Sequence, residues 1–569
     1  MGSSSVKNLE CRSKLSILKN FKKMKNKLKK LNRFGFGCIL FSVILLSCDK
    51  DILNQLPKDT LTKTFIWSDS QGAIQFVNGI YGNLHSGFDR NYEGWGKGIY
   101  LLDGTTDDGD VCMPWTSAEQ LQSGEFLPSN APWAETWADY YNLARKTNVA
   151  LENLKNLEDE SLKNRLIGEV YFLRAMIYHE LLRFYGMKSD GNEPTGVPII
   201  DKPLTPDDDL QIPRSTYDEV VNFIISDIDK AMPLLSKKGQ VEEGKATTGA
   251  AYALKSRVLL YAERWVDAAD AANTIINTEY TLFEDYRTLF LEKNNNEVIF
   301  AKKFQSPDKV HFGVNNGFDV INSPRSFKGP NDAGWGGCVP TQNFVDSYDM
   351  IDGEPQTTSP LFDPSNPYEN LDPRFEATVV HNGSVFRGHT MEMYPGGADV
   401  TFEPEDSKTG YQLRKFHEEQ FPVYSKSSDQ DWIYFRYAEV LLNYAEAKNE
   451  ASGPDGSVYN AINTIRQRAG IPDLSGGLSK DAMREKIRNE RRVELVFEDH
   501  RFFDIRRWRI AENLLNGPLI GMKIEKVGDT FEYTRYEFET RSFPAKLYVF
   551  PIPQSEIEKN PAAKQIAGW

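Results

Sequence analysis

Apolar residues recur every three or four positions along much of the chain, a spacing that predicts helices with one buried face. Between about residues 65 and 280 the pattern is clearest over 166–184, and Gly186 marks a natural end for that helix. Ser215 or Thr216 is available as the N-cap of a further helix, and Glu219, three residues after Thr216, has the spacing of a capping-box partner. Two Ala-rich patterns predict a closely packed helical hairpin: residues 246–263 and 265–277.

The pattern changes after about residue 280. Residues 281–430 are dense in Gly, Pro, Asn and Asp, and their apolar runs are too short for helices, which predicts a loop-rich insertion. Within residues 431–569, helical periodicity returns in three segments and is followed by a Pro-rich tail with room for one short helical turn: 433–449, 458–469, 480–508 and 547–569. The fold is therefore expected to be dominated by α-helices, as a tetratricopeptide-like helical-repeat scaffold carrying a large loop-rich lobe.

The N-terminal region has the pattern of an export signal. Eleven Lys or Arg and one acid precede an apolar run of 14 residues, 34–47. At ~1.5 Å per residue a helix of that length covers about 21 Å, which is too short for a hydrocarbon core of about 30 Å. Residues 1–47 are thus predicted to be a signal peptide, and Met24 offers an alternative start of translation.

Leu45, Leu46 and Ser47 before Cys48 resemble a lipobox. Cleavage there would leave Cys48 as an acylated first residue, so the mature protein is expected to be lipid-anchored rather than membrane-spanning. An ordinary secretory signal with an incidental Cys48 is the alternative, since Ser47 also suits ordinary cleavage. The polar residues 48–64 would then form a lipidated tether.

Charge excludes some partners. Without residues 1–47 the chain keeps 56 basic and 80 acidic side chains, a net charge of about −24. This balance argues against binding to nucleic acid or to anionic lipid headgroups, and leaves neutral partners open. Besides Cys48, the mature chain has only Cys112 and Cys338, which is no disulfide framework; the two could pair or remain buried thiols.

No residue pattern indicates catalysis, a cofactor or a metal site. Gly-x-Ser-x-Gly and Walker motifs are absent, and His179 lacks the second His that a zinc-protease helix needs four residues later. Residues 103–110 carry four Asp without an EF-hand loop, so a calcium site is the minor alternative to a solvated or ligand-bonding loop. The charge-dense segment after residue 484 predicts helical ion pairs worth ~0.2–0.5 kcal/mol each: Glu485/Arg488, Arg491/Glu494 and Glu498/Arg501.

Tryptophans on loops are the candidate binding residues. Exposed aromatic rings surrounded by polar groups suit ligands with both apolar and hydroxyl-bearing faces, and sugars are one such class. Four tryptophans lie on predicted loops: Trp95, Trp115, Trp133 and Trp335. Trp335 has glycines on both sides, which is expected to leave the backbone bare and the ring directed toward ligand.

Several segments stand in a characteristic order along the chain: residues 168–175, 182–186, 340–346, 436–442, 462–466, 488–495, 500–508 and 551–553. Together they resemble the SusD/RagB family of outer-membrane nutrient-binding lipoproteins. The resemblance extends over nearly the whole mature chain and is most specific in its C-terminal half. On this resemblance, the loop-rich insertion 281–430 is expected to bind ligand.

The resemblance implies a non-enzymatic surface protein that binds glycans and acts as a lid on a TonB-dependent, SusC-like outer-membrane transporter. Asp49 and Asp51 stand where the family carries a surface-export signal, and Trp95 and Trp335 stand where it carries binding aromatics. We therefore expect a lipid-anchored outer-membrane protein, facing the cell exterior, that captures an oligosaccharide or polysaccharide. Peptide capture by the same arrangement and an anchored glycan-degrading enzyme are the alternatives.

Overall fold

The computed structural model describes residues 67, 69–88, 101–189, 193–276, 278–311, 317–328, 333–400 and 407–569, all within one compact unit, Ile66–Trp569. The residues of the predicted signal peptide lie outside the described residues, as do Cys48, Asp49, Asp51 and Trp95.

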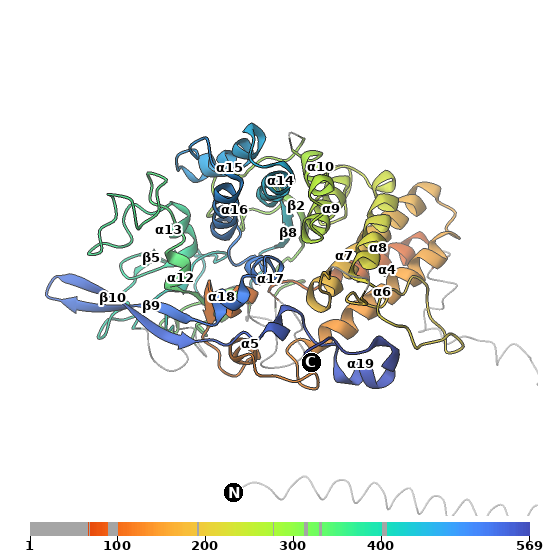
Figure 1. Cartoon of the computed structure of the whole chain (residues 1–569), viewed down its shortest axis with the longest axis horizontal. Helices are drawn as coiled ribbons and strands as arrows, with labels where there is room; N and C mark the ends of the chain where they lie inside the picture. The colour runs from red at the N-terminus through yellow and green to blue at the C-terminus, as the bar shows by residue number, and fades with distance from the viewer. Residues whose placement is uncertain are drawn as a thin grey trace, which may run out of the picture. The chain divides into compact units, whose positions relative to one another are not determined.

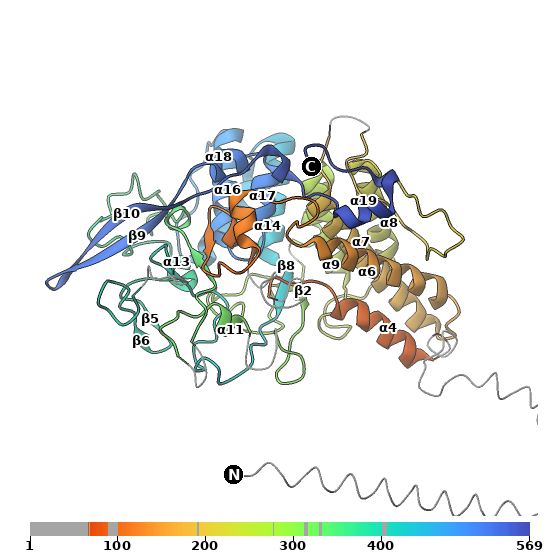
Figure 2. The same ribbon diagram turned by 90° about the horizontal axis from the view of Figure 1, so that it is seen from below.

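A series of paired helices forms the scaffold (Figures 1 and 2). Helix α7 packs against both α6 and α8, and α9 packs against both α8 and α10. The next contact is between α10 and α14, so the helices before and after the loop-rich segment form one continuous stack. The bounds are α4 (Ser70–Gly82), α6 (Ala134–Leu154), α7 (Glu160–Tyr185), α8 (Tyr217–Ala231), α9 (Thr248–Tyr261), α10 (Trp265–Asn273), α14 (Tyr437–Ser452), α15 (Gly456–Ala469) and α16 (Lys480–Glu494).

The local signals in the sequence explain where these helices begin and end. Gly186 is the C-cap of α7, as predicted. The capping box at α8 is confirmed: the Thr216 hydroxyl accepts from the backbone N–H of Glu219, whose carboxylate accepts from the N–H of Thr216. Helices α9 and α10 form the predicted hairpin and turn at Glu263, which has φ 57°.

The loop-rich lobe contains short elements around its own aromatic core. Rings such as Phe318, Phe344, Tyr348 and Phe416 are almost completely buried there. The elements are α11 (Phe318–Ile321), α12 (Gln342–Val345), α13 (Arg374–Thr378), β2 (Val298–Lys302), β3 (Cys338–Pro340), β4 (Val379–Val380), β5 (Val385–Phe386), β6 (His389–Thr390) and β7 (Gln412–Leu413). The prediction of a helical scaffold with a loop-rich lobe is confirmed.

Two helical boundaries were predicted wrongly. The aromatic and β-branched run at Trp432–Arg436 is a strand, β8, which pairs antiparallel with β2, and its helix begins only at Tyr437. The segment 480–508 is two helices, α16 and α17 (Arg501–Arg507), because Phe497 and Asp499 take φ values of 61° and 62° between them.

The C-terminal region adds a feature that helical periodicity does not reveal. Strands β9 (Pro518–Val527) and β10 (Thr530–Thr540) form a hairpin that turns at Gly528, φ 63°, and extends from the helices in Figure 1. The predicted short helical turn in the tail is present as α19 (Gln554–Lys559). The remaining elements are η3 (Leu102–Thr105), β1 (Gly109–Val111), α5 (Ala118–Ser123), η4 (Met232–Leu234), α18 (Ala511–Leu515), η5 (Ala545–Tyr548) and η6 (Pro561–Ala563).

Among the helices in the described part of the chain, none combines the length and the apolar character needed to cross a bilayer.

Candidate functional site

A two-stranded sheet brings two of the predicted tryptophans together. Strands β1 and β3 pair antiparallel, with Gly109 opposite Pro340 and Val111 opposite Cys338. Trp115 follows β1 and Trp335 precedes β3, so the two loops leave the sheet at the same end. The indole rings meet edge to face, with centroids 5.9 Å apart and planes at 74°.

The two rings differ in exposure. Trp115 is 44% exposed, which is high for a ring of this size. Trp335 is partly buried and packs against the main hydrophobic core. The pair therefore consists of one ring open to solvent and a second ring that supports it from the scaffold side.

The glycines around Trp335 serve close packing rather than openness. The backbone N–H of Trp335 donates to the carbonyl of Val320 at 3.1 Å, and the N–H of Gly336 donates to that of Ser323 at 3.0 Å. A Cβ atom at Gly334 would lie 2.3 Å from the Ser323 carbonyl oxygen. The prediction of a bare backbone around Trp335 is wrong: the glycines let residues 333–337 press against 320–324, which fixes the ring in place.

A third loop reaches the same place. The Tyr424 hydroxyl donates to the carbonyl of Ala333, two residues before Trp335, at 2.9 Å. Tyr424 has φ 65° and is partly buried. Nothing in the sequence distinguishes it from other loop tyrosines, so sequence reasoning missed it.

The structure corrects the prediction for Trp133. Its side chain is only 4% exposed, although it lies outside a helix and directly before α6. Its ring lies 5.6 Å from that of Phe550 and 6.0 Å from those of Phe184 and Phe502, measured between centroids. Trp133 is therefore a core residue, and its ring is not available to a ligand.

The Asp-rich segment beside β1 is neither solvated nor arranged for calcium. Asp107 pairs with Arg501 at 2.8 Å and with Arg492 at 2.9 Å, and Asp108 pairs with Arg492 at 2.6 Å. Asp103 accepts hydrogen bonds from the backbone N–H groups of residues 497 and 499. Burial would raise the pKa of Asp107, but Arg501 and Arg492 hold it below its ordinary value. Within the described ranges, no group of three His, Cys, Asp or Glu side chains could hold a metal ion.

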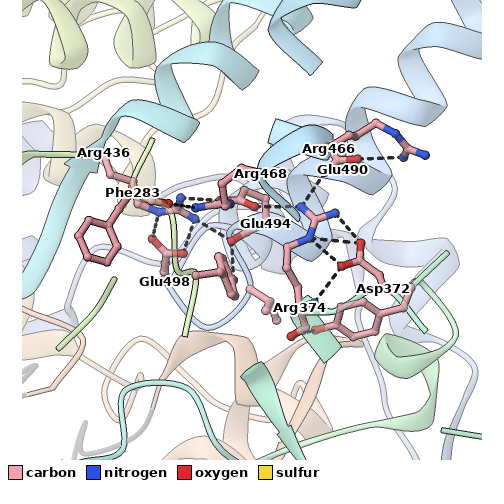
Figure 3. Close-up of polar contacts among 12 residues, drawn as sticks. Phe283, Asp372, Arg374, Arg436, Arg466, Arg468, Glu490, Glu494 and Glu498 are labelled. Carbon is pink, nitrogen blue, oxygen red and sulfur yellow. Dashed lines mark hydrogen bonds and ion pairs between the residues drawn. The ribbon is translucent and has the colours of Figure 1, made fainter. Parts of the chain in front are cut away.

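The charge-dense segment forms a buried network (Figure 3). Glu494, fully buried, accepts from Arg436 at 2.6 Å, from Arg374 at 2.9 Å and from Arg468. Glu498 pairs with Arg436 at 2.7 Å. Burial would raise the pKa of Glu494, but the three guanidinium groups lower it below its ordinary value.

The predicted ion pairs were therefore only partly right. Glu485 pairs with Arg488 at 3.3 Å on an exposed face. Arg491 instead pairs with Asp504 at 2.7 Å, and Arg501 pairs with Asp107. The energies of exposed helical pairs do not apply to these buried groups, which join segments distant in sequence. A separate set of pairs, in which Arg492 and Arg501 bind Asp107 and Asp108, holds the segment that leads directly into β1.

One cysteine, Cys338, lies on β3, and the other, Cys112, directly follows β1. Val111 is opposite Cys338, and the N–H of Cys112 donates to the carbonyl of Gly337 at 2.8 Å, so the two side chains leave opposite faces of the strand pair. Both are buried and are not joined by a disulfide bond. Burial raises the pKa of the Cys338 thiol.

Comparisons with known proteins agree with this architecture. Residues 296–569 match the model of the SusD family, and residues 100–260 match a model described as starch-binding associating with the outer membrane. The helical scaffold with its loop-rich lobe is shared with solved SusD-like structures. One, a SusD-like protein from Bacteroides fragilis, is 33% identical with a TM-score of 0.78, covering 90% of this chain and 100% of its own. The chain belongs to the SusD family.

Two further relatives extend the comparison. A SusD-like carbohydrate-binding protein from Bacteroides fragilis has a TM-score of 0.75 and 25% identity, covering 88% of this chain and 100% of its own. A SusD-like protein from Formosa agariphila is 24% identical over 559 residues, which is 92% of this chain and 96% of that relative.

Proposed function

We propose that this protein captures an oligosaccharide or polysaccharide at the cell surface and delivers it to a TonB-dependent, SusC-like transporter in the outer membrane, without chemistry of its own. The observation that carries glycan capture is the edge-to-face pair of Trp115 and Trp335, held by β1 and β3. Membership of a family with starch-binding and carbohydrate-binding members supports it.

The geometry suits a sugar because the Trp115 ring is open to solvent and rests on the Trp335 ring, which is fixed. An exposed indole face can stack on the apolar C–H face of a pyranose, and a ring that is already immobilised loses little conformational entropy on binding. Backbone hydrogen bonds hold the Trp335 ring in place: Trp335 donates to Val320, and its neighbour Gly336 donates to Ser323. Trp95 remains a proposed third contact in the same site.

A glycan array tests the proposal. A soluble form, residues 49–569, is expected to bind one or a few oligosaccharide classes and no member of a matched oligopeptide library. Binding to peptides alone would instead indicate peptide capture. Release of new reducing ends from a bound glycan would indicate an enzyme.

Replacing Cys48 with Ala is expected to release the protein from the outer membrane while leaving it folded. Acyl chains supply the proposed anchoring, and the apolar run before Cys48 is too short to span the bilayer. Fractionation of cells followed by immunoblotting measures this. Recovery of the variant in the outer-membrane fraction at the level of the unmodified protein would contradict lipid anchoring.

Exchanging Asp49 and Asp51 for Asn is expected to keep the protein lipidated but facing the periplasm. The reason is their position directly after the proposed lipidated Cys48, where the family carries its export signal. Protease treatment of whole cells is the measurement: the unmodified protein should be digested and the variant protected. Equal digestion of both would count against the outward-facing proposal.

A further inference from the structure

A cavity with excess positive charge lies where the C-terminal end of α7 meets α17, and neither Trp115 nor Trp335 is among its lining residues. Its volume is about 470 Å³, within the range of small-molecule sites. Two acidic residues line it, Glu193 and Glu263. Its cationic lining residues are Arg183, Lys188, Arg506, Arg507 and Arg509.

Three of the five cations are neutralised within the fold. Arg183 pairs with Glu180 at 2.6 Å, Lys188 with Glu263 at 2.5 Å, and Arg507 with Glu446 at 2.5 Å. Arg506 and Arg509 form no ion pair with any carboxylate of the described residues. The cavity therefore keeps two cations that the described part of the fold does not balance.

Arg506 is the more unusual of these two because it is buried. Arg506 is only 8% exposed. Its guanidinium group donates hydrogen bonds to the carbonyls of Phe502 at 2.7 Å and Leu547 at 3.3 Å. The guanidinium carbon also lies 3.5 Å from the centroid of the Phe502 ring. Burial lowers the pKa of Arg506 to about 9. The two carbonyls and the ring offset part of the cost of burying this cation, but no carboxylate of the described residues pairs with it, so an anionic ligand would stabilise it further.

Arg509 stands at the mouth of the same cavity. It follows the end of α17 with φ 57° and is exposed, and its guanidinium carbon lies 4.7 Å from the centroid of the Tyr548 ring. An exposed and a buried arginine thus reach one cavity from the end of one short helix. The Nε and one Nη of Arg506 already donate to carbonyls, which leaves its other Nη and the Arg509 guanidinium as donors for an oxyanion that enters the cavity.

The rest of the lining suits a sugar ring. Tyr217, Tyr261, Tyr548 and Phe503 contribute aromatic side chains to the wall. The Tyr261 hydroxyl is buried and has no hydrogen-bond partner among the described groups. Aromatic rings beside unbalanced arginines form a site for a pyranose that carries a negative charge.

We propose that this cavity binds the sulfate or carboxylate group of an acidic saccharide through Arg506 and Arg509, as a second site distinct from the tryptophan pair. The site would let the protein hold a charged unit of a glycan in a cavity whose lining does not include Trp115.

Calorimetric titration of the full-length lipoprotein in detergent tests this with four probes: glucose 6-sulfate, glucuronate, glucose and sodium sulfate. One or both charged sugars should bind, and glucose should not. A variant carrying R506Q and R509Q should bind the charged sugar at least tenfold more weakly. Arg535→Gln is the matched control, because Arg535 lies on β10 and pairs with Asp346 at 2.6 Å; it should bind as the unmodified protein does.

The outcomes separate the alternatives. Binding of glucose 6-sulfate alone assigns a sulfate site, and binding of glucuronate alone assigns a carboxylate site. Sodium sulfate binding as tightly as the charged sugars would overturn the saccharide assignment, and no binding of either charged sugar would overturn the site. If R506Q does not fold, R509Q alone should still weaken binding at least threefold; unchanged affinity in R509Q would then overturn the proposal. Alanine at Trp115 and Trp335 should leave this binding unchanged, so failure here does not affect the proposed glycan capture.

Discussion

Alanine at both Trp115 and Trp335 is expected to weaken binding of the captured glycan by at least about thirtyfold, or about 2 kcal/mol, because central aromatic contacts contribute most of the energy in such sites. Trp115→Ala alone should produce most of this loss of affinity, since Trp115 is the exposed ring of the pair. Calorimetric titration with the glycan found on the array measures the affinity. Unchanged affinity in the double variant would remove this pair from the binding site.

Stability measurements on the same variants separate binding from folding. Trp115→Ala should change the free energy of unfolding by no more than about 0.5 kcal/mol, as exposed side chains usually do. Trp133→Ala is the core control and should cost about 3–5 kcal/mol, because its ring is enclosed by Phe184, Phe502 and Phe550. The loss of unfolding free energy in Trp335→Ala should fall between those of the other two variants, since the Trp335 ring is partly buried.

Glu494→Gln is expected to lower the free energy of unfolding by about 3 kcal/mol, the lower end of the cost of breaking a buried ion pair. Its carboxylate is shared by Arg374, Arg436 and Arg468, and a neutral amide cannot balance them. The cost stays at the lower end because each arginine keeps another carboxylate, such as Asp372 for Arg374. Urea denaturation followed by circular dichroism measures the difference.

Glu485→Gln is the matched control on the same helix. Glu485 is largely exposed and its pair with Arg488 spans 3.3 Å, so its loss should cost no more than about 0.5 kcal/mol. Equal stability losses in the two variants would contradict a special role for the buried network.

The helical scaffold was predictable because its signals are local. The capping box at Thr216, the C-cap at Gly186 and the apolar face of α7 each act within a few residues. The strand β8 was missed because its pairing with β2 depends on residues more than a hundred positions away. The charged segment after residue 484 was limited in the same way. Its composition predicted ion pairs, but the partners of Arg491 and Arg501 could not be read from it.

The candidate site was predictable in its residues but not in its arrangement. Loop position indicated Trp115 and Trp335, yet their contact depends on the pairing of β1 with β3, which joins segments more than 200 residues apart. Loop position also indicated Trp133, which packs inward because Phe502 and Phe550 come from the distant C-terminal region. Neither Tyr424 nor the cavity beside α17 has a sequence signal that separates it from ordinary loop and core residues.

The two-stranded sheet of β1 and β3 affects how the binding specificity of such a protein can change. The loop between β1 and α5 begins and ends on fixed elements, and Trp115 lies within it. Lengthening a loop whose ends are already held costs little, about 0.6 kcal/mol for each doubling of its length. Insertions between residues 112 and 117 could therefore alter which sugar is recognised while the strand pair, its buried aspartates and the helices behind them keep their stability.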